Sequence, residues 1–370
     1  MRRTSRFRAL NVAKRRQAVT IRHVAAEAGV SLQTVSRILN KAPNVRDETV
    51  ARVQAAIDRL GYVPSLAAQR MAGAHSYFIL ALNDRARTIA DWQSDQGTGW
   101  VDQMLLGGML TCAKHGYRMI VELVDTHSDH IERELMAALA AVQPDGVILT
   151  PPHSGNPLIV RLLTEQGISF ARIGSTSAGG GFMLVMDDER AGRIATEHLV
   201  ALGHRRIGFV AGPASYELSG WRVEGWRGAM AAAELDTTDL LVPGDFSHDA
   251  GRAAGAWLLE LADPATAIIA SNDQMALGVL ELARGRGVRV PEALSLVSFD
   301  DTPAVRFAHP PLTAITQPVA QVAARAVELI IAARKGRAST SDPINIPVSL
   351  QIRQTTAVPT RSRVSQAHAF

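Results

Sequence analysis

Apolar side chains recur at a spacing of three and four residues in three successive segments near the start of the chain, which is typical of amphipathic helices. Thr20 is placed to cap the first segment, and Gly29 ends it, because glycine tolerates the left-handed backbone of a sharp turn. Ser31 is placed to cap the second segment, and Gly61 ends the third. The pattern predicts an all-α unit over residues 19–64.

From Tyr77 onward, strand-like apolar runs alternate with amphipathic helical runs, which is typical of an α/β fold with parallel sheets. The predicted strands are 77–82, 117–124, 146–150, 168–173, 206–211, 267–271, 294–299 and 346–351. The predicted helices are 104–115, 131–142, 158–166, 190–202, 221–235, 249–261, 275–284 and 319–334. Asn83–Val101 is predicted to be one long loop, and such loops are often functional.

Polar pairs follow four of the strands. They are Asn83–Asp84, Asp187–Asp188, Asn272–Asp273 and Asp300–Asp301. Each pair alone is compatible with an ordinary turn, because Asn and Asp are common there. Ligands of parallel α/β sheets bind outside the carboxyl ends of the strands, so the repetition favours a hydrogen-bonding ligand held between two α/β lobes.

The second short helix has a polar face that suits a nucleic acid. Leu32, Gln33, Ser36, Arg37 and Asn40 share this face, opposite the apolar side. It offers an amide for adenine, a guanidinium for guanine or phosphate, and an apolar group for a thymine methyl. Two helices and a tight turn of this kind indicate a helix-turn-helix that reads the major groove.

Composition narrows the class of protein. A chain of 370 residues with 47% hydrophobic content is long enough for more than one domain. It has no apolar run of the ~18 residues that span a membrane, and no signal-peptide core. A single cysteine suits a reducing cytoplasm. Residues 1–18 carry basic side chains without a carboxylate; we expect either a disordered tail attracted to phosphate or an extension without a role.

Several motifs resemble those of the lactose repressor (LacI) family of bacterial transcription regulators, in its sugar-responsive branch. They are TVSR (Thr34–Arg37), GYVP (Gly61–Pro64), the AxxxAG hinge end (Ala68–Gly73), EHLVALGHRRI (Glu197–Ile207), AGP (Ala211–Pro213), SNDQMALG (Ser271–Gly278), FDDT (Phe299–Thr302) and PPLT (Pro310–Thr313). The resemblance implies a helix-turn-helix domain at 19–64 and a hinge helix with linker at 65–75. A two-lobed α/β effector and dimerisation domain, like periplasmic binding proteins, would span 76–360, followed by a tail at 361–370.

The resemblance also implies how DNA is contacted. Gln33 and Arg37 would meet base edges or phosphates, with Leu32 against a thymine methyl. Other contacts would fix the register on the backbone or enter the minor groove; these residues are Thr20, Thr34, Ser36, Asn40, Asn44, Ser65, Ala68 and Met71. Met71 replaces the family's leucine, which wedges into the minor groove and kinks the duplex.

For the effector, the resemblance implies that Arg222, Asn272 and Asp300 bond the ligand's hydroxyls. Phe246 would cover an apolar sugar face, and Gln317 would lie in a crossing segment beside the cleft; Asn83 joins them from the strand-end pattern. A sugar is the expected effector, and a nucleobase corepressor is the alternative within the family.

The expected partners are a near-palindromic double-stranded operator, the small molecule and a second copy of the chain. The tail shows no heptads, so a dimer is expected rather than a tetramer. A solute-binding protein would share the α/β fold but requires export. No Gly-rich phosphate loop or nucleophile motif is present, and His127 and His130 lack a third metal ligand nearby. We therefore expect no enzyme, cofactor, metal or membrane partner, and a cytoplasmic location.

Overall fold

A computed structural model describes residues 19–39, 43, 45–62, 75–93, 99–126, 129–338 and 342–360. The chain divides into two compact units, Met1–Ser76 and Tyr77–Phe370, and each is described by itself. The predicted tails, the hinge helix and His127 lie outside the described residues. So do five of the predicted DNA-binding residues, namely Asn40, Asn44, Ser65, Ala68 and Met71.

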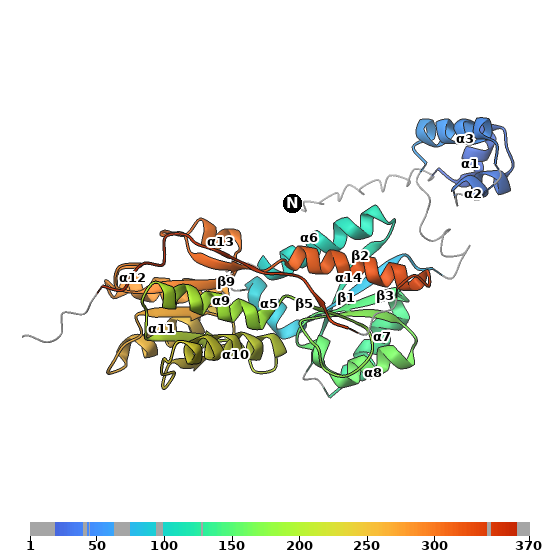
Figure 1. Ribbon diagram of the computed structural model, residues 1–370. Helices are drawn as coiled ribbons and strands as arrows, with labels where there is room; N and C mark the ends of the chain where they lie inside the picture. The colour runs from blue at the N-terminus through green and yellow to red at the C-terminus, as the bar shows by residue number, and fades with distance from the viewer. Residues whose placement is uncertain are drawn as a thin grey trace, which may run out of the picture. The chain divides into compact units, whose positions relative to one another are not determined.

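The first unit consists of three helices, α1 (Ile21–Ala28), α2 (Leu32–Leu39) and α3 (Asp47–Leu60), as the sequence predicts (Figure 1). One small core joins them, with Val24, Val35 and Val53 fully buried at its centre. Gly29 and Gly61 end α1 and α3 with φ values of 62° and 59°. Because this left-handed region is costly for other residues, the two glycines set where the helices stop.

The second unit contains two lobes, each with a six-stranded sheet. The first lobe has the strand order β11-β5-β4-β3-β1-β2, and all of these pairs are parallel. Its strands are β1 (Phe78–Asp84), β2 (Arg118–Val124), β3 (Gly146–Leu149), β4 (Ser169–Ile173), β5 (Phe182–Val185) and β11 (Ile344–Asn345). Its helices are α5 (Arg85–Gln93), α6 (Gly99–Lys114), α7 (Ile131–Val142), η1 (His153–Gly155), α8 (Pro157–Glu165) and α14 (Val319–Arg334).

Alternating residues of β1 explain why this strand reads as a continuous apolar run. Ile79 belongs to a buried cluster with residues of α6 and α14, whereas Leu80 belongs to a cluster with residues of α7 and α8. The two helix pairs cover opposite faces of the sheet (Figure 1). Both faces of a parallel sheet are then buried, so both sets of side chains are apolar.

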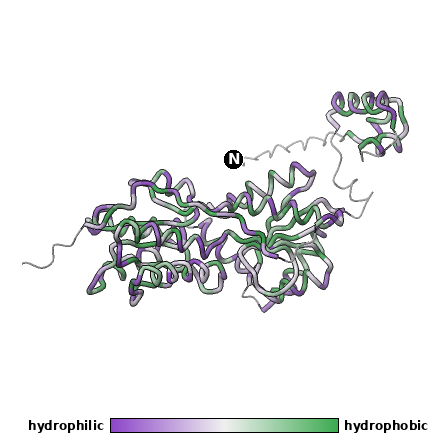
Figure 2. Tube along the Cα trace, viewed as in Figure 1, coloured by the Kyte–Doolittle hydropathy of each residue, from purple (hydrophilic) through white to green (hydrophobic). Residues whose placement is uncertain are grey.

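The second lobe has the strand order β12-β10-β9-β8-β6-β7, with β12 antiparallel to β10. Its strands are β6 (Ile207–Ala211), β7 (Leu241–Pro243), β8 (Ala267–Ala270), β9 (Ser295–Asp300), β10 (Thr313–Thr316) and β12 (Ser349–Gln351). Its helices are α9 (Asp188–Ala201), α10 (Glu217–Ala232), α11 (His248–Glu260), α12 (Asp273–Gly285) and α13 (Pro303–Arg306). Hydrophobic segments follow the strands through the interior of both lobes (Figure 2).

The chain passes between the lobes three times, which places the functional region where these crossings meet. It crosses after β5 near Asp187, returns after β10 at Gln317 and Pro318, and crosses again between β11 and β12. Each lobe therefore contains segments that are distant in sequence. The predicted fold class, with a helical DNA-binding region and a two-lobed α/β region, is confirmed.

Two details of the predicted elements are wrong. Asn83–Val101 is not one long loop, because α5 occupies much of it. Asp84 Oδ1 accepts a hydrogen bond from the Arg87 backbone N–H at 2.7 Å, which starts the helix. Only Thr88 of α5 is buried, so no apolar stripe reveals the helix. The last predicted strand, 346–351, is instead β11 and β12, which belong to different sheets.

Helices α9 and α10 approach each other closely at Gly192 and Gly225, and this contact supports a testable prediction. A Cβ on Gly225 would lie 1.9 Å from the Glu189 backbone oxygen, whereas one on Gly220 of the same helix would meet open space. Gly225→Ala should therefore reduce the free energy of unfolding by about 1–3 kcal/mol through overpacking. Gly220→Ala should raise it by up to about 1 kcal/mol, since alanine favours the helix. Urea denaturation of both variants tests the contact, and equal stabilities would contradict it.

Candidate functional site

A cavity of about 120 Å³ lies where the carboxyl ends of strands from both lobes meet. The first lobe supplies Asn83, Asp84, Arg87, Thr88, Asp91, Trp100, Val101, Thr150 and Pro151, and the second supplies Tyr216, Leu218, Arg222, Phe246, Asn272 and Asp300. Charged, amide and aromatic side chains therefore share one wall. This arrangement is typical of a site for a small polar ligand.

Five of the six predicted effector residues line this cavity, namely Asn83, Arg222, Phe246, Asn272 and Asp300. The sixth, Gln317, lies among buried residues at a crossing segment, and its Nε2 donates to Asp188 Oδ1 at 3.0 Å. The structure brings the five cavity residues together from segments up to 217 residues apart, from Asn83 to Asp300. Their binding roles stay predictions.

Arg222 is fixed in place by the protein itself. Its Nε donates to Asp188 Oδ1 at 2.8 Å, and its Nη1 donates to the Ser271 carbonyl oxygen. The guanidinium carbon lies 4.8 Å from the centre of the Phe299 ring. A buried guanidinium is costly in free energy without such partners. These contacts therefore offset the cost of its desolvation and fix its orientation. Nη2 is the nitrogen left for a ligand among the described contacts.

Asn272 also has a structural function. Its Oδ1 caps α12 by accepting from the Met275 N–H at 2.9 Å, and its Nδ2 donates to the Phe246 carbonyl oxygen at 2.9 Å. Phe246 has a positive φ of 69°, which costs free energy for a bulky residue. The Asn272 amide helps to hold this conformation, and the Phe246 ring then forms part of the cavity wall.

The sequence does not predict Arg87, which connects the two lobes beside the cavity. Its Nη1 and Nη2 donate to the carbonyl oxygens of Asp245 and Phe246, at 2.5 and 3.0 Å. Its Nε pairs with Asp91 Oδ1 at 2.9 Å, and Tyr216 meets the Phe246 ring edge-on at 5.4 Å between ring centres. The four-residue spacing of Arg87 and Asp91 is the one signal in the sequence that could have revealed this helix.

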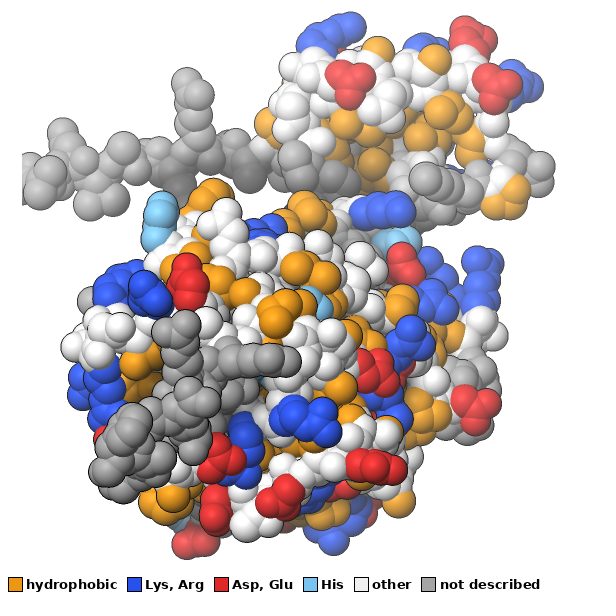
Figure 3. Space-filling view, turned by 60° about the vertical axis from the view of Figure 1, so that its left-hand side comes forward, with side chains coloured by type: hydrophobic (Ala, Val, Ile, Leu, Met, Phe, Trp, Pro, Cys, Tyr) orange, Lys and Arg blue, Asp and Glu red, His pale blue; other side chains and the backbone are white. Residues whose placement is uncertain are grey.

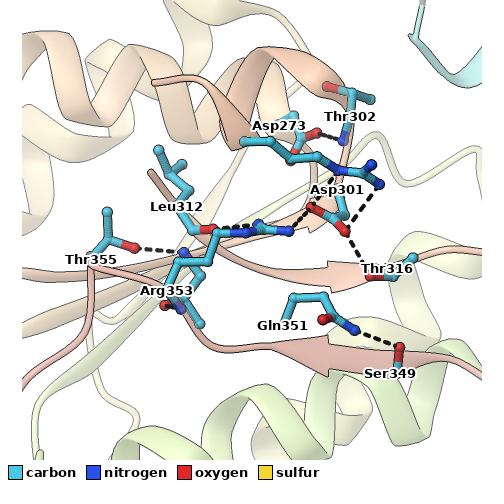
Figure 4. Close-up of polar contacts among 11 residues, drawn as sticks. Asp273, Asp301, Thr302, Leu312, Thr316, Ser349, Gln351, Arg353 and Thr355 are labelled. Atoms are coloured by element: carbon cyan, nitrogen blue, oxygen red, sulfur yellow. Dashed lines mark hydrogen bonds and ion pairs between the residues drawn. The ribbon is translucent and has the colours of Figure 1, made fainter. Parts of the chain in front are cut away.

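The adjacent residues Asp300 and Asp301 have different surroundings. Asp300 lines the cavity, whereas the Asp301 carboxylate pairs with Arg306 at 3.2 Å and Arg353 at 2.6 Å and accepts from the Thr316 hydroxyl at 2.8 Å (Figure 4). Both residues have positive φ values, 91° and 61°. The strained end of β9 therefore separates a carboxylate that lines the cavity from one that is held by ion pairs.

Asp273 and Asp300 form a buried pair of like charges. Burial raises the pKa of both carboxyls above their ordinary range; the charge of Asp300 raises the pKa of Asp273 further, and the charge of Asp188 raises that of Asp300. Arg222 opposes the rise at Asp300, and the Thr302 N–H opposes it at Asp273, where it donates to Oδ2 at 2.7 Å. The folded protein therefore favours the protonated form of these carboxyls, Asp273 above all, more than the unfolded chain does.

The predicted DNA-reading helix α2 presents the expected side chains. Leu32, Gln33 and Arg37 are exposed, and Thr34 and Ser36 are half-buried. The Ser31 hydroxyl accepts from the Thr34 N–H at 3.1 Å, so Ser31 caps the helix as predicted. In the first helix the Thr20 backbone N–H donates to His23 Nδ1 at 3.0 Å. Arg37 Nη2 donates to the Pro43 carbonyl oxygen at 3.0 Å, which orients the guanidinium.

Comparison with known proteins agrees with both regions. The sequence model described as "Bacterial regulatory proteins, lacI family" matches residues 20–65, and that of a "Periplasmic binding protein-like domain" matches residues 196–356. The HTH-type transcriptional regulator CelR of Thermobifida fusca is 31% identical over 350 residues, which cover 90% of this chain and 96% of that protein.

Solved structures are similar as well. A transcriptional regulator CelR–cellobiose complex has a TM-score of 0.68 and 28% identity, covering 91% of this chain and 99% of that one. The Lac repressor dimer bound to operator and the anti-inducer ONPF has a TM-score of 0.74 and 27% identity, covering 92% and 100%.

Fold and site together define a helix-turn-helix transcriptional regulator with a binding-protein-like α/β region. The chain belongs to the LacI family of bacterial regulatory proteins. The family resemblance expected from the sequence is thereby confirmed. Among the residues that the structure describes, no helix is long and apolar enough to cross a membrane.

The buried carboxyl pair predicts a pH dependence of stability. A pKa raised by folding means that the folded state holds more protons, so the free energy of unfolding should fall as pH rises from about 4 toward neutrality. Asp273→Asn keeps an acceptor for the Thr302 N–H but removes the charge, so this variant should lose less stability between pH 5 and 7.5.

Chemical denaturation across this pH range measures the difference. Asp249→Asn is the matched control, because the Asp249 side chain is 92% exposed and its removal should leave the wild-type slope unchanged. A slope for Asp273→Asn equal to that of wild type would show that the pair is not coupled to folding.

Proposed function

We propose that this regulator is a repressor that binds a near-palindromic operator as a homodimer. When a sugar occupies the cavity, the protein would either release the operator or bind it more tightly. The observation that carries the proposal is the cavity wall, where Arg222, Asn272 and Asp300 from the second lobe meet Asn83 from the first. Residues 19–64 would bind DNA, 65–75 would form the hinge and linker, and 76–360 would bind the effector and dimerise.

The chemistry of the cavity wall supports a sugar as the effector. Carboxylate, amide and guanidinium groups make directional hydrogen bonds to hydroxyls. Phe246, Tyr216 and Trp100 add aromatic surface to the same cavity, which suits the C–H face of a sugar ring. A relative of known structure, CelR, is bound to cellobiose. A nucleobase, the alternative within the family, would use the aromatic surface but leave more of the hydrogen-bonding groups unpaired.

Exposed apolar side chains support a second copy of the chain as partner. Leu106, Met109 and Leu110 lie on α6 with 50%, 53% and 63% of their surface exposed. Their spacing places them on one helix face, and apolar patches of this kind mark interaction sites. Hydrophobic side chains are visible at the surface of the α/β unit (Figure 3). The Lac repressor structure similar to this chain is a dimer on its operator.

Contacts between the lobes explain how a ligand could act at a distance. Arg87 joins the lobes on one side, and Glu217 of α10 accepts from the Thr176 N–H at 3.2 Å and from the Ser175 hydroxyl. A ligand between these contacts would change the angle of the lobes if it bound one arrangement better. A differential affinity equivalent to about 1–3 kcal/mol is typical of such coupling.

The proposal places the protein in the cytoplasm, where its operator would be, and assigns it a regulatory rather than a catalytic role. The relatives named above are transcriptional regulators. Turnover of a substrate by the purified chain would contradict this assignment.

The recognition helix generates a prediction about DNA affinity. Arg37→Ala should weaken binding to an operator selected from random DNA by about 1–3 kcal/mol, because a base or phosphate contact is lost. Arg59→Ala removes the same charge from α3, where Arg59 pairs with Glu27 at the surface, and should have a much smaller effect. Fluorescence anisotropy at fixed salt measures both variants. Equal affinities would refute the assignment of α2.

The cavity generates a prediction about response. Asp300→Asn should abolish the effect of the effector on operator binding while leaving operator affinity itself intact, because Asp300 lies in the α/β unit and lines the cavity. The effector is first found by a thermal-shift screen of sugars and nucleobases, since a ligand of the folded state raises the melting temperature. If the effector still changes the operator binding of this variant as it does for wild type, the effector binds at another site.

A further inference from the structure

The charges on the cavity wall are unequal. Three carboxylates line it, those of Asp84, Asp91 and Asp300, against two guanidinium groups, those of Arg87 and Arg222. Directly behind the wall lies one further buried carboxylate, Asp188 beside Arg222; Asp273 beside Asp300 adds little negative charge near neutral pH, because burial raises its pKa to about 8. The region therefore carries an excess of negative charge before any ligand binds.

Both guanidinium groups are already engaged by the protein. All three nitrogens of Arg87 donate within the chain, to Asp91 and to two carbonyl oxygens of the opposite lobe. Arg222 uses Nε on Asp188 and Nη1 on Ser271. One guanidinium nitrogen, Arg222 Nη2, is thus left for a ligand, and the charge of this group is balanced by Asp188.

Acceptors, in contrast, remain without strong donors. The Asp84 carboxylate accepts from the Arg87 backbone N–H and, at 3.4 Å, from the Thr126 hydroxyl, but it meets no cation in the described contacts. Burial, and then the charge of Asp84, raises the pKa of the Tyr216 phenol. Asp188 Oδ2 and Gln317 Oε1 are buried without a hydrogen-bond partner among the described residues.

Resting on the proposed function, we propose that the effector is a positively charged amino sugar. An ammonium group donates hydrogen bonds and accepts none, and it supplies the positive charge that Asp84 lacks among its described contacts. The hydroxyls and ring of the same molecule satisfy the amide and aromatic groups of the wall. Phosphorylated sugars and sugar acids are disfavoured, because their anions would meet uncompensated carboxylates.

A metal ion does not explain the charge. Within the described residues, no group of three or more carboxylate, histidine or cysteine side chains is arranged to hold one. A simple polyamine would leave Phe246 and Tyr216 without a ring to cover.

The test uses the full-length protein and matched sets of sugars. Each set contains the neutral sugar, its 2-amino derivative and its acid, for glucose, galactose, mannose and cellobiose. Thermal shift ranks the compounds, and calorimetry gives the Kd of the best set. The amine should raise the melting temperature most and bind about tenfold tighter than its neutral counterpart, as expected for a charge-assisted bond.

Two variants test whether the preference for the amine comes from Asp84 in the cavity wall. In Asp84→Asn the amine should lose about tenfold more affinity than the neutral sugar, because the amide removes the charge but still accepts from the Arg87 N–H. Asp249→Asn removes an exposed carboxylate from α11 and should change neither Kd.

The outcomes separate the two proposals. If a neutral or acidic sugar binds as well as the amine or better, the amino-sugar assignment is overturned while the sugar-responsive function stands. An unchanged preference in Asp84→Asn also overturns it. If no sugar of any set binds, the proposed sugar response itself fails.

Discussion

One buried ion pair connects the parts of the α/β unit. Arg222 and Asp188 meet at 2.8 Å with 3% and 0% of their side chains exposed, and breaking such a pair costs about 3–5 kcal/mol. Asp188 starts α9, where the chain has just crossed into the second lobe, and it also accepts from Gln317 at the return crossing. Arg222 also donates to the Ser271 carbonyl oxygen at the end of β8, and it lines the cavity. The crossing segments and the cavity are thus connected through one guanidinium.

This shared anchor has a consequence for control. A ligand that contacts Arg222 would meet a group bonded to Asp188, which also accepts from Gln317, so its binding would act on residues at two of the segments that cross between the lobes. Arg87 and Glu217 add contacts between the lobes at other points. Because packed interfaces tend to have discrete arrangements rather than continuous ones, small changes at the cavity are well placed to become changes of lobe angle.

The residues of the candidate site differ in how they could be predicted from the sequence. Asn83, Asn272 and Asp300 could be selected because parallel strands bring their carboxyl ends to one edge, a rule that needs no coordinates. Arg222 and Phe246 required the family resemblance, since neither follows from periodicity. Neither approach predicts Arg87. Helix α5 buries almost no side chain, so the sequence shows no helical period there. The partners of Arg87 in the other lobe are backbone carbonyl oxygens, which every residue has.

The sequence alone determined the helix-turn-helix, many of the helices and strands, and the division into a helical and an α/β region, because periodicity and capping are local properties. It missed α5 and the short strands β5, β7 and β10. The strand-end pattern offered Asp300 and Asp301 equally and the family resemblance favoured Asp300, but only the tertiary structure gives the physical reason why Asp300 and not Asp301 faces the cavity. Asp301 is neutralised by Arg353, 52 residues further along the chain, while Asp300 faces a cavity formed by both lobes. That choice depends on charges brought together by folding, and no local pattern contains it.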